Sequence, residues 1–144
     1  MKLKIDNETI AEEFFECSCL LGIVAPIKDY QFTWYINQML GFNFRLNNNI
    51  EIQLVKKERN YFFSIYEYKV PGCCVYHYLY NNQHDGEYLL PEFKHLDFLW
   101  LVKGEEMDKE ELTTLQQSLK LLPSVQLVNE MAYEKIRNKQ HLIF

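Results

Sequence analysis

The sequence has little that marks a secreted, membrane-spanning or nucleotide-binding protein. Its five glycines are all separated, so it has no glycine-rich phosphate loop. Its longest apolar run, Cys19 to Ile27, is about half the length of a membrane-spanning helix and contains Gly22 and Pro26. Positive charge is also scarce, because 15 Lys and Arg stand against 20 Asp and Glu. The net charge of -5 disfavours general binding to nucleic acid or to an acidic membrane surface.

Cysteine is equally sparse, with four residues that occur as Cys17-x-Cys19 and Cys73-Cys74. Neither spacing is that of a zinc knuckle or of a thioredoxin-type redox pair. A mixed metal site that adds His77 is conceivable, but we expect buried, reduced thiols that pack as small hydrophobes. The N-terminal lysines are followed by acids rather than by the apolar run of a signal peptide. We therefore expect a cytoplasmic protein with no metal and no cofactor.

What the chain does have is the apolar patterning of one α+β domain over residues 1–144. Alternation over Lys2–Ile5 and β-forming residues within Phe14–Val24 predict two early strands. Apolar stripes predict two amphipathic helices, over residues 29–40 and 108–122. Gly41 suits the left-handed end of the first helix, and Asp108 suits the N-cap of the second.

Between these helices, alternating residues over 42–90 predict an antiparallel meander, with a turn at Asn47–Asn49. The nearly continuous apolar run 96–102 predicts a strand buried on both faces. That strand, the second helix and a strand over 125–128 together predict a right-handed crossover with a parallel pair. A short helix is expected over 132–139, and the apolar end at 141–144 is expected to pack on the domain. The expected fold is a mostly antiparallel, twisted sheet with the two amphipathic helices packed on one face.

The segment Leu90-Pro91-Glu92-Phe93-Lys94-His95-Leu96-Asp97-Phe98 resembles the motif of the IPExxxVDY family, small proteins of the Bacteroidetes without an assigned activity. Pro91, Glu92 and Asp97 match the motif letters. The three apolar motif positions carry Leu, Leu and Phe in place of Ile, Val and Tyr. The stretch from Lys28 to Gly41 also resembles the early helix of this family. The resemblance implies a cytoplasmic bacterial protein, and it implies no reaction, cofactor or ligand.

Structural roles explain the three matched residues most simply. Pro91 lacks a backbone donor, which suits the mouth of a strand or an edge position. Asp97 opens a buried strand, so its carboxylate is expected to accept hydrogen bonds from loop or helix-end amides, and Glu92 is expected to do the same or to pair with Lys94. An acid–base set of Glu92, His95 and Asp97 is the least poor catalytic alternative. Because the chain has no Gly-x-Ser-x-Gly elbow and no recognisable nucleophile motif, we predict no catalytic site.

Aromatic residues make up 15% of the chain, and two groups of them are candidate interaction surfaces. Tyr30 and Trp34 lie four apart, off the core stripe of the first helix, and would anchor a protein partner if a neighbouring loop does not bury them. Five tyrosines on two neighbouring strands would form a second aromatic surface: Tyr66, Tyr68, Tyr76, Tyr78 and Tyr80. Such rows resemble an RNA-stacking platform, although few Lys or Arg flank them.

Three functional hypotheses follow. The first is a non-catalytic protein that acts through contacts with a protein partner or as a homodimer. The second is a small-molecule-binding module with an aromatic-lined pocket between sheet and helix, or, with less support, an RNA-associated protein. The third is an enzyme. An exposed aromatic patch favours the first hypothesis, a closed apolar pocket with a few convergent polar groups favours the second, and a common cleft for Glu92, His95 and Asp97 favours the third.

Overall fold

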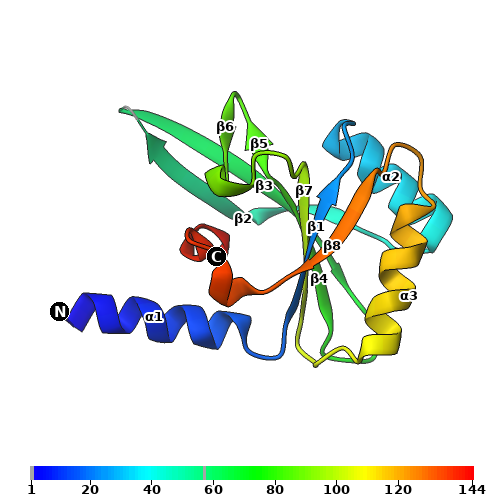
Figure 1. The fold of residues 1–144 in the computed structure, drawn as a ribbon, viewed down its shortest axis with the longest axis horizontal. Helices are drawn as coiled ribbons and strands as arrows, with labels where there is room; N and C mark the ends of the chain where they lie inside the picture. Colours follow the sequence, from blue (N-terminus) through cyan, green and yellow to red (C-terminus); the bar gives the residue numbers. More distant parts are fainter. Residues whose placement is uncertain (1, 57) are drawn as a thin grey trace.

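A computed structural model describes residues 2–56 and 58–144 of the chain, and residues 2–8 by their backbone alone. The described part contains three α-helices and a six-stranded antiparallel sheet, which confirms the α+β class (Figure 1). The helices are α1 (Lys2–Phe15), α2 (Asp29–Leu40) and α3 (Lys109–Lys120). The sheet has the order β2-β3-β4-β7-β1-β8. The strands are β1 (Cys19–Val24), β2 (Arg45–Lys56), β3 (Arg59–Lys69), β4 (Tyr76–Asn81), β5 (Gln83–His84), β6 (Glu87–Tyr88), β7 (Phe98–Lys103) and β8 (Leu127–Met131).

Each face of the sheet has its own buried cluster, because successive residues of a strand point to opposite faces. We call the first the helix-side cluster; it contains Leu21, Trp100 and Val102 of the sheet together with Phe32 and Ile36 of α2 and Leu112, Leu115 and Leu119 of α3. We call the second the C-terminal cluster; it contains the intervening sheet residues Leu20, Leu99 and Leu101 together with Phe14, Phe15, Ile136 and Leu142. The near-continuous apolar run of β7 follows from this arrangement, since both of its faces are buried.

The predicted helices α2 and α3 are present, with the predicted end residues. Gly41 ends α2 in the left-handed conformation, with φ of 76°. The side chain of Asp108 accepts a hydrogen bond from the amide of Glu111 at 2.8 Å and so caps the start of α3. Asp29 lies in the first turn of α2, where its carboxylate accepts a hydrogen bond from the hydroxyl of Tyr66 at 2.9 Å.

The N-terminal prediction is wrong, because residues 2–15 form helix α1 rather than a strand. The predicted second strand begins only at Cys19, after a residue with positive φ, Cys17. Phe14 and Phe15 stand at the start of the predicted strand, whose β-forming residues come later in the run. They belong to the helix instead, where Ala11, Phe14 and Phe15 are buried together on the third- and fourth-residue spacing of a helical stripe. Tertiary burial therefore overrides a weak local preference here.

The meander is confirmed for β2, β3 and β4, which pair in sequence and antiparallel. Its last part is not, because β5 and β6 form a separate two-stranded sheet. The turn predicted at Asn47–Asn49 is not a chain reversal. These residues lie inside β2, where the pairing register with β3 shifts between Leu46 and Glu51. Residues 47–50 therefore form an irregular insertion opposite Ile65 within one continuous strand. A local turn is present there, since the side-chain oxygen of Asn47 accepts a hydrogen bond from the amide of Asn49 at 2.9 Å.

The predicted parallel pair is also wrong. β7, α3 and β8 do follow one another, but β1 lies between β7 and β8 and pairs antiparallel with both. The crossover therefore passes over one intervening strand. β1 enters the sheet from far away in the sequence, so a pattern confined to residues 96–128 could not reveal it.

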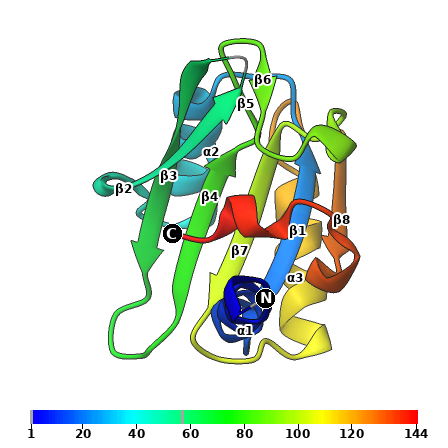
Figure 2. The ribbon, with the colours of Figure 1, turned by 90° about the vertical axis from the view of Figure 1, so that its left-hand side faces the viewer.

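The C-terminal segment crosses the face of the sheet opposite to α2 and α3 (Figure 2). Instead of one helix over 132–139, it has two 3₁₀ turns, η2 (Tyr133–Lys135) and η3 (Lys139–Leu142). The prediction that the apolar terminus packs on its own domain is confirmed. Leu142 is fully buried, and its carbonyl accepts a hydrogen bond from the hydroxyl of Tyr80 at 2.7 Å.

Candidate functional site

The exposed face of α2 carries the aromatic pair that the sequence singled out. Tyr30 is 61% exposed and Trp34 is 59% exposed, so no neighbouring loop buries them. The Trp34 ring lies edge-on to Tyr35, and these side chains line a hollow of about 270 Å³ with Gln31. Large aromatic side chains exposed this far are uncommon on a surface that only meets water.

This face of α2 also lacks charge. Asp29 is the only charged residue of the helix, whose sequence is DYQFTWYINQML. The solvent side of a surface helix normally carries charged residues, as α3 does with Lys109, Glu110, Glu111 and Lys120. The outward positions of α2 instead combine aromatic and amide side chains, which is the composition of a protein interface more than that of a solvated face.

The five tyrosines of β3 and β4 do not form one surface. Tyr66 pairs with Leu79 and Tyr68 with His77, which places both tyrosines on the helix side of the sheet. Tyr76, Tyr78 and Tyr80 belong to the C-terminal side. The prediction of a shared aromatic platform is therefore wrong. Two of its members are also covered, since Tyr80 is fully buried and Tyr78 is 7% exposed.

Three of these tyrosines, Tyr66, Tyr78 and Tyr80, have surroundings that keep the hydroxyl protonated. Burial and the neighbouring Asp29 carboxylate raise the pKa of Tyr66. Burial also raises the pKa of Tyr78, which lies beside Glu67, and that of Tyr80. The hydroxyls therefore act as hydrogen-bond groups of the fold, and only Tyr30 and Trp34 of the predicted interaction residues are left as exposed anchors.

The matched motif residues hold the loop between β6 and β7. The carboxylate of Asp97 accepts a hydrogen bond from the amide of Ala25 at 2.8 Å, as the sequence predicts for a residue at the start of a buried strand. Pro91 begins a 3₁₀ turn, η1 (Pro91–Phe93), after β6. Its missing donor is harmless there because the first amides of a helical turn have no partner within that turn.

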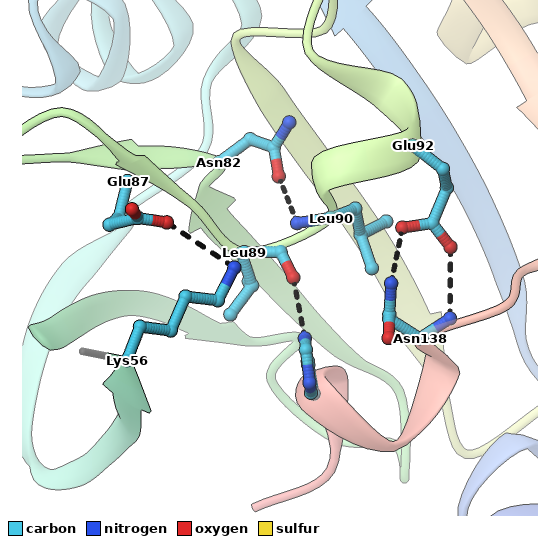
Figure 3. Close-up of polar contacts among 8 residues, drawn as sticks. Lys56, Asn82, Glu87, Leu89, Leu90, Glu92 and Asn138 are labelled. Carbon is cyan, nitrogen blue, oxygen red and sulfur yellow. Dashed lines mark hydrogen bonds and ion pairs between the residues drawn. The ribbon is translucent and has the colours of Figure 1, made fainter. Parts of the chain in front are cut away.

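Glu92 binds the distant residue Asn138 rather than Lys94. Its two carboxylate oxygens accept from the backbone amide of Asn138 at 2.9 Å and from its side-chain amide at 2.7 Å (Figure 3). Partial burial raises the pKa of Glu92, but the hydrogen bonds from Asn138 together with those from the backbone of Glu92 and Arg137 outweigh it and leave the pKa below its usual value. The motif glutamate therefore links the loop after β6 to the C-terminal segment.

Asn82 holds the same loop from inside. Nothing in the sequence distinguishes it from the other turn residues around it. It is fully buried. Its side-chain amide donates to the carbonyls of Phe93 and Leu96 at 3.0 and 2.9 Å. Its side-chain oxygen accepts from the amide of Leu90 at 2.8 Å, the bond that Figure 3 shows. The loop thus uses both N–H donors of the side-chain amide and one of the two lone pairs of its oxygen.

The three catalytic candidates do not share a cavity. His95 lines a cavity of about 230 Å³ beside Gly22 and Met131. Asp97 lines a different one of about 550 Å³, together with Lys28 and Asp29. Glu92 lines neither of these two, and its carboxylate is held by Asn138. The set does not have the mutual contact that acid–base chemistry on one substrate requires.

A groove lies between α3, the residues at the end of α2, and β4. It measures about 540 Å³ and its lining includes Leu40, Phe42, His77, Met107 and Leu115. A neighbouring cavity of about 270 Å³ shares His77, Met107 and Glu111 with it. A groove of this size between helix and sheet is in the range of small-molecule sites.

His77 is the buried polar group of this groove. It is 5% exposed and surrounded by the rings of Phe42, Phe44, Tyr68 and Trp100. Burial lowers its pKa from 6.5 to about 4, so the imidazole is neutral at pH 7. The sequence offered one signal for it, since His77 alternates with the apolar Val75 and Leu79 on a strand whose other face carries tyrosines.

The hydrogen bond of His77 fixes its tautomer. Its Nδ1 lies 3.0 Å from the indole nitrogen of Trp100. An indole N–H can only donate, so Nδ1 must accept, and the single proton of the neutral ring is on Nε2. Among the hydrogen bonds of the described residues, none involves Nε2 of His77, although the residue lines both cavities. The groove therefore presents one N–H donor from its floor.

The outer side of the groove is acidic. Asp108, Glu110 and Glu111 line it, and Glu105 and Glu106 line the neighbouring cavity. Neither lining includes a Lys or an Arg. The two ion pairs found in the described part of the chain, Lys56–Glu87 and Arg59–Asp85, lie at the β5–β6 hairpin (Figure 3 shows the first). Among the described residues, the carboxylates of the groove therefore form no ion pair with a Lys or an Arg.

The cysteines are more exposed than predicted. Cys17 and Cys74 are exposed, and Cys19 and Cys73 are half-buried. Residues 71–74 form a turn rather than a strand, which explains why Cys74 faces solvent. No group of three His, Cys, Asp or Glu side chains within the described residues is arranged to hold a metal ion. The described helices include none that is both long and apolar enough to cross a bilayer.

The site is thus built from two neighbouring parts of the molecule: the uncharged aromatic face of α2 and the acidic groove around His77. The resemblance of residues 90–98 to the IPExxxVDY motif remains a prediction of the sequence. Comparison with protein-family models and with curated proteins gave no match to the chain.

Proposed function

We propose that this is a non-catalytic binding protein that acts through protein contacts, and that the aromatic face of α2 binds a second copy of the chain. The observation that carries the proposal is the exposure of Tyr30 and Trp34, 61% and 59%, on one side of a helix. Tyrosine and tryptophan are the residues that contribute most often to the affinity of protein interfaces. A cytoplasmic location in a bacterium of the IPExxxVDY lineage is part of the same proposal and rests on the sequence alone.

Charge restricts the face at which a second copy can bind. Each molecule carries a net charge of -5, so two copies repel each other over most of their surfaces. From Tyr30 to Leu40 the helix has no charged side chain, so this face brings no like charges together. A two-fold contact would place α2 against α2 and bury each Trp34 against the partner's helix.

The packing of the helices supports this choice of surface. We infer that α2 and α3 cover the same face of the sheet, because their buried residues belong to one cluster. The inner stripe of α2, Phe32 and Ile36, is then used by the core. Tyr30 and Trp34 lie on the other side of the helix and are free for an interface without any change in the fold.

Sedimentation equilibrium of the full chain tests the proposal. We expect the wild type to dimerise in the micromolar range and Trp34→Ser to weaken the dimer by roughly tenfold or more, as for an interface hot spot. Leu121→Ser is the matched control, because Leu121 is 82% exposed at the end of α3 and its loss should leave the dimer unchanged. A wild type that stays monomeric, or a Trp34→Ser variant that dimerises as well as wild type, would refute the α2 interface.

A further inference from the structure

The groove around His77 has the parts of a small-ligand site, and it is separate from the aromatic face of α2. Its walls include Phe42 and Leu115, which are apolar, and its volume of about 540 Å³ can hold a molecule of one ring with a short chain. A ligand of this size gains affinity when its apolar surface is buried between these walls. The walls alone would accept many apolar molecules, so the choice of ligand depends on the polar groups.

The first polar group is the N–H of His77. Nδ1 accepts from Trp100 at 3.0 Å, which leaves Nε2 as the donor. This residue is 95% removed from solvent by the fold (5% exposed) and lines both cavities, and the described residues supply no acceptor for Nε2. Among the described residues no fully buried side-chain nitrogen or oxygen lacks a partner, so Nε2 is open to the groove, where a water molecule or a ligand can accept from it. A ligand atom that accepts a hydrogen bond therefore fits the inner end of the groove.

The second polar feature is the charge of the outer side. Glu110 and Glu111 line the groove in the first turn of α3, beyond the capping carboxylate of Asp108. The positive end of the helix offsets only about half of one charge, whereas three carboxylates line the groove here. With no Lys or Arg in the lining, a cation on the ligand is the complementary group.

We propose that this groove binds a small arylalkylamine. The ring lies between Phe42 and Leu115, an acceptor on the ring takes the hydrogen bond from Nε2 of His77, and the ammonium group lies at Glu110 and Glu111. The proposal goes beyond the dimer, since no residue of the α2 face takes part in it.

The first experiment is a titration of the full chain with 4-methoxyphenethylamine, followed by ¹H–¹⁵N NMR. The ether oxygen of this probe can only accept, as Nε2 requires. The indole N–H of Trp100 reports binding, because it is bonded to the ring of His77. We expect a dissociation constant of roughly 0.1–1 mM, typical of a good ligand of this size.

Two analogues separate the contributions of the ligand. Phenethylamine lacks the acceptor and is expected to bind roughly fivefold more weakly, the effect of one buried hydrogen bond. 4-Methoxyphenylacetate replaces the amine by a carboxylate and is expected to bind at least about tenfold more weakly, because it meets like charge. Equal binding of the amine and the carboxylate would overturn the proposal, as would the absence of any shift of the Trp100 signal with the amine.

The double variant Glu110→Gln/Glu111→Gln tests the protein side without affecting the core, since both residues are exposed. We expect it to bind the amine roughly fivefold to tenfold more weakly, because it loses two partly solvated charge contacts. Glu51→Gln/Glu58→Gln is the control with the same change of net charge, at two exposed residues outside the groove lining. Equal weakening by both double variants would contradict specific contacts at the groove.

Trp34→Ser distinguishes this inference from the dimer. This variant should bind the amine with the affinity of the wild type, whether or not it dimerises. Loss of amine binding in Trp34→Ser would place the ligand at the α2 face and overturn the assignment to His77.

Discussion

Trp100 and His77 are diagonal neighbours on adjacent strands, and the indole nitrogen of Trp100 donates to Nδ1 of His77 at 3.0 Å. Their rings meet edge-on, with centroids 5.7 Å apart. Both side chains are buried on the helix side of the sheet, Trp100 completely. One bond thus satisfies the polar atom of the largest core residue and fixes which nitrogen of the histidine carries the proton.

The first prediction concerns the pH dependence of stability. Burial lowers the pKa of His77 from 6.5 to about 4 in the folded protein. Between these values the unfolded chain binds the proton and the folded chain does not, so the free energy of unfolding falls as pH drops from 6.5 to 4. The difference of 2.5 pH units corresponds to a loss on the order of 3 kcal/mol, which is complete below pH 4. Stability above pH 6.5 is unaffected by this group.

Urea unfolding at several pH values, together with an NMR titration of the imidazoles, checks this prediction. His77→Gln should show a smaller loss between pH 6.5 and pH 4 than the wild type, because the titrating group is gone. His84→Gln is the matched control, since His84 is exposed in β5. An imidazole signal of His77 that titrates near pH 6.5 would contradict the burial argument.

The second prediction is that Asn82→Ala destabilises the fold by about 3 kcal/mol. The substitution leaves the amide of Leu90 and the carbonyl of Leu96 without their partner, and buried polar groups left unpaired cost about 1–3 kcal/mol each before the loop relaxes. The carbonyl of Phe93 also loses Asn82 but still accepts from the amide of Leu96 at 3.0 Å. Asn48→Ala removes an exposed asparagine from β2 and should change stability by less than about 0.5 kcal/mol. Chemical denaturation of both variants measures the difference. Similar stabilities would mean that the loop does not depend on Asn82.

The features that could be predicted from the sequence are those that depend on residues close together in the chain. The stripe of α2, the capping pair Asp108–Glu111 and the β2–β3–β4 meander are all set within a short stretch of chain. The acceptor role of Asp97 was predictable for the same reason, since the start of a buried strand needs such a group. The partner of Glu92 was not predictable, because Asn138 is 46 residues away.

The tyrosine rows show why the rest could not be predicted. Alternation shows which residues of one strand share a face. It does not show the pairing register, which decides the residues of the next strand that lie on the same face of the sheet. In the observed register, even-numbered residues of β3 pair with odd-numbered residues of β4, as Tyr66 does with Leu79. Tyr66 and Tyr78 therefore lie on opposite sides of the sheet. The insertion of β1 between β7 and β8 is a second long-range fact of this kind.

The third prediction compares two glycines with positive φ. A Cβ at Gly104, where φ is 107°, would overlap the backbone carbonyl of Cys74. A Cβ at Gly41, where φ is 76°, would meet no atom within 4 Å. Gly41→Ala should therefore cost only the left-handed strain of about 1–2 kcal/mol. Gly104→Ala should cost about 3 kcal/mol or more, because the backbone must shift as well. Thermal unfolding of both variants checks the order, and a Gly104→Ala protein as stable as Gly41→Ala would contradict the close approach to Cys74.

The fourth prediction concerns the C-terminal segment, which completes the second face of the sheet. Leu142 is fully buried, whereas Leu121 is 82% exposed, so the same substitution at the two sites isolates the effect of burial. Leu142→Ala should lower the free energy of unfolding by about 3 kcal/mol, since it removes transfer free energy and leaves a cavity. Leu121→Ala should change it by less than about 0.5 kcal/mol. Urea denaturation gives both values, and the slope should be the same in all three proteins if the unfolded state is unaffected. If the C-terminal segment packed only on a partner protein, it would not contribute to the free energy of unfolding of the single chain. Leu142→Ala would then be about as stable as the wild type.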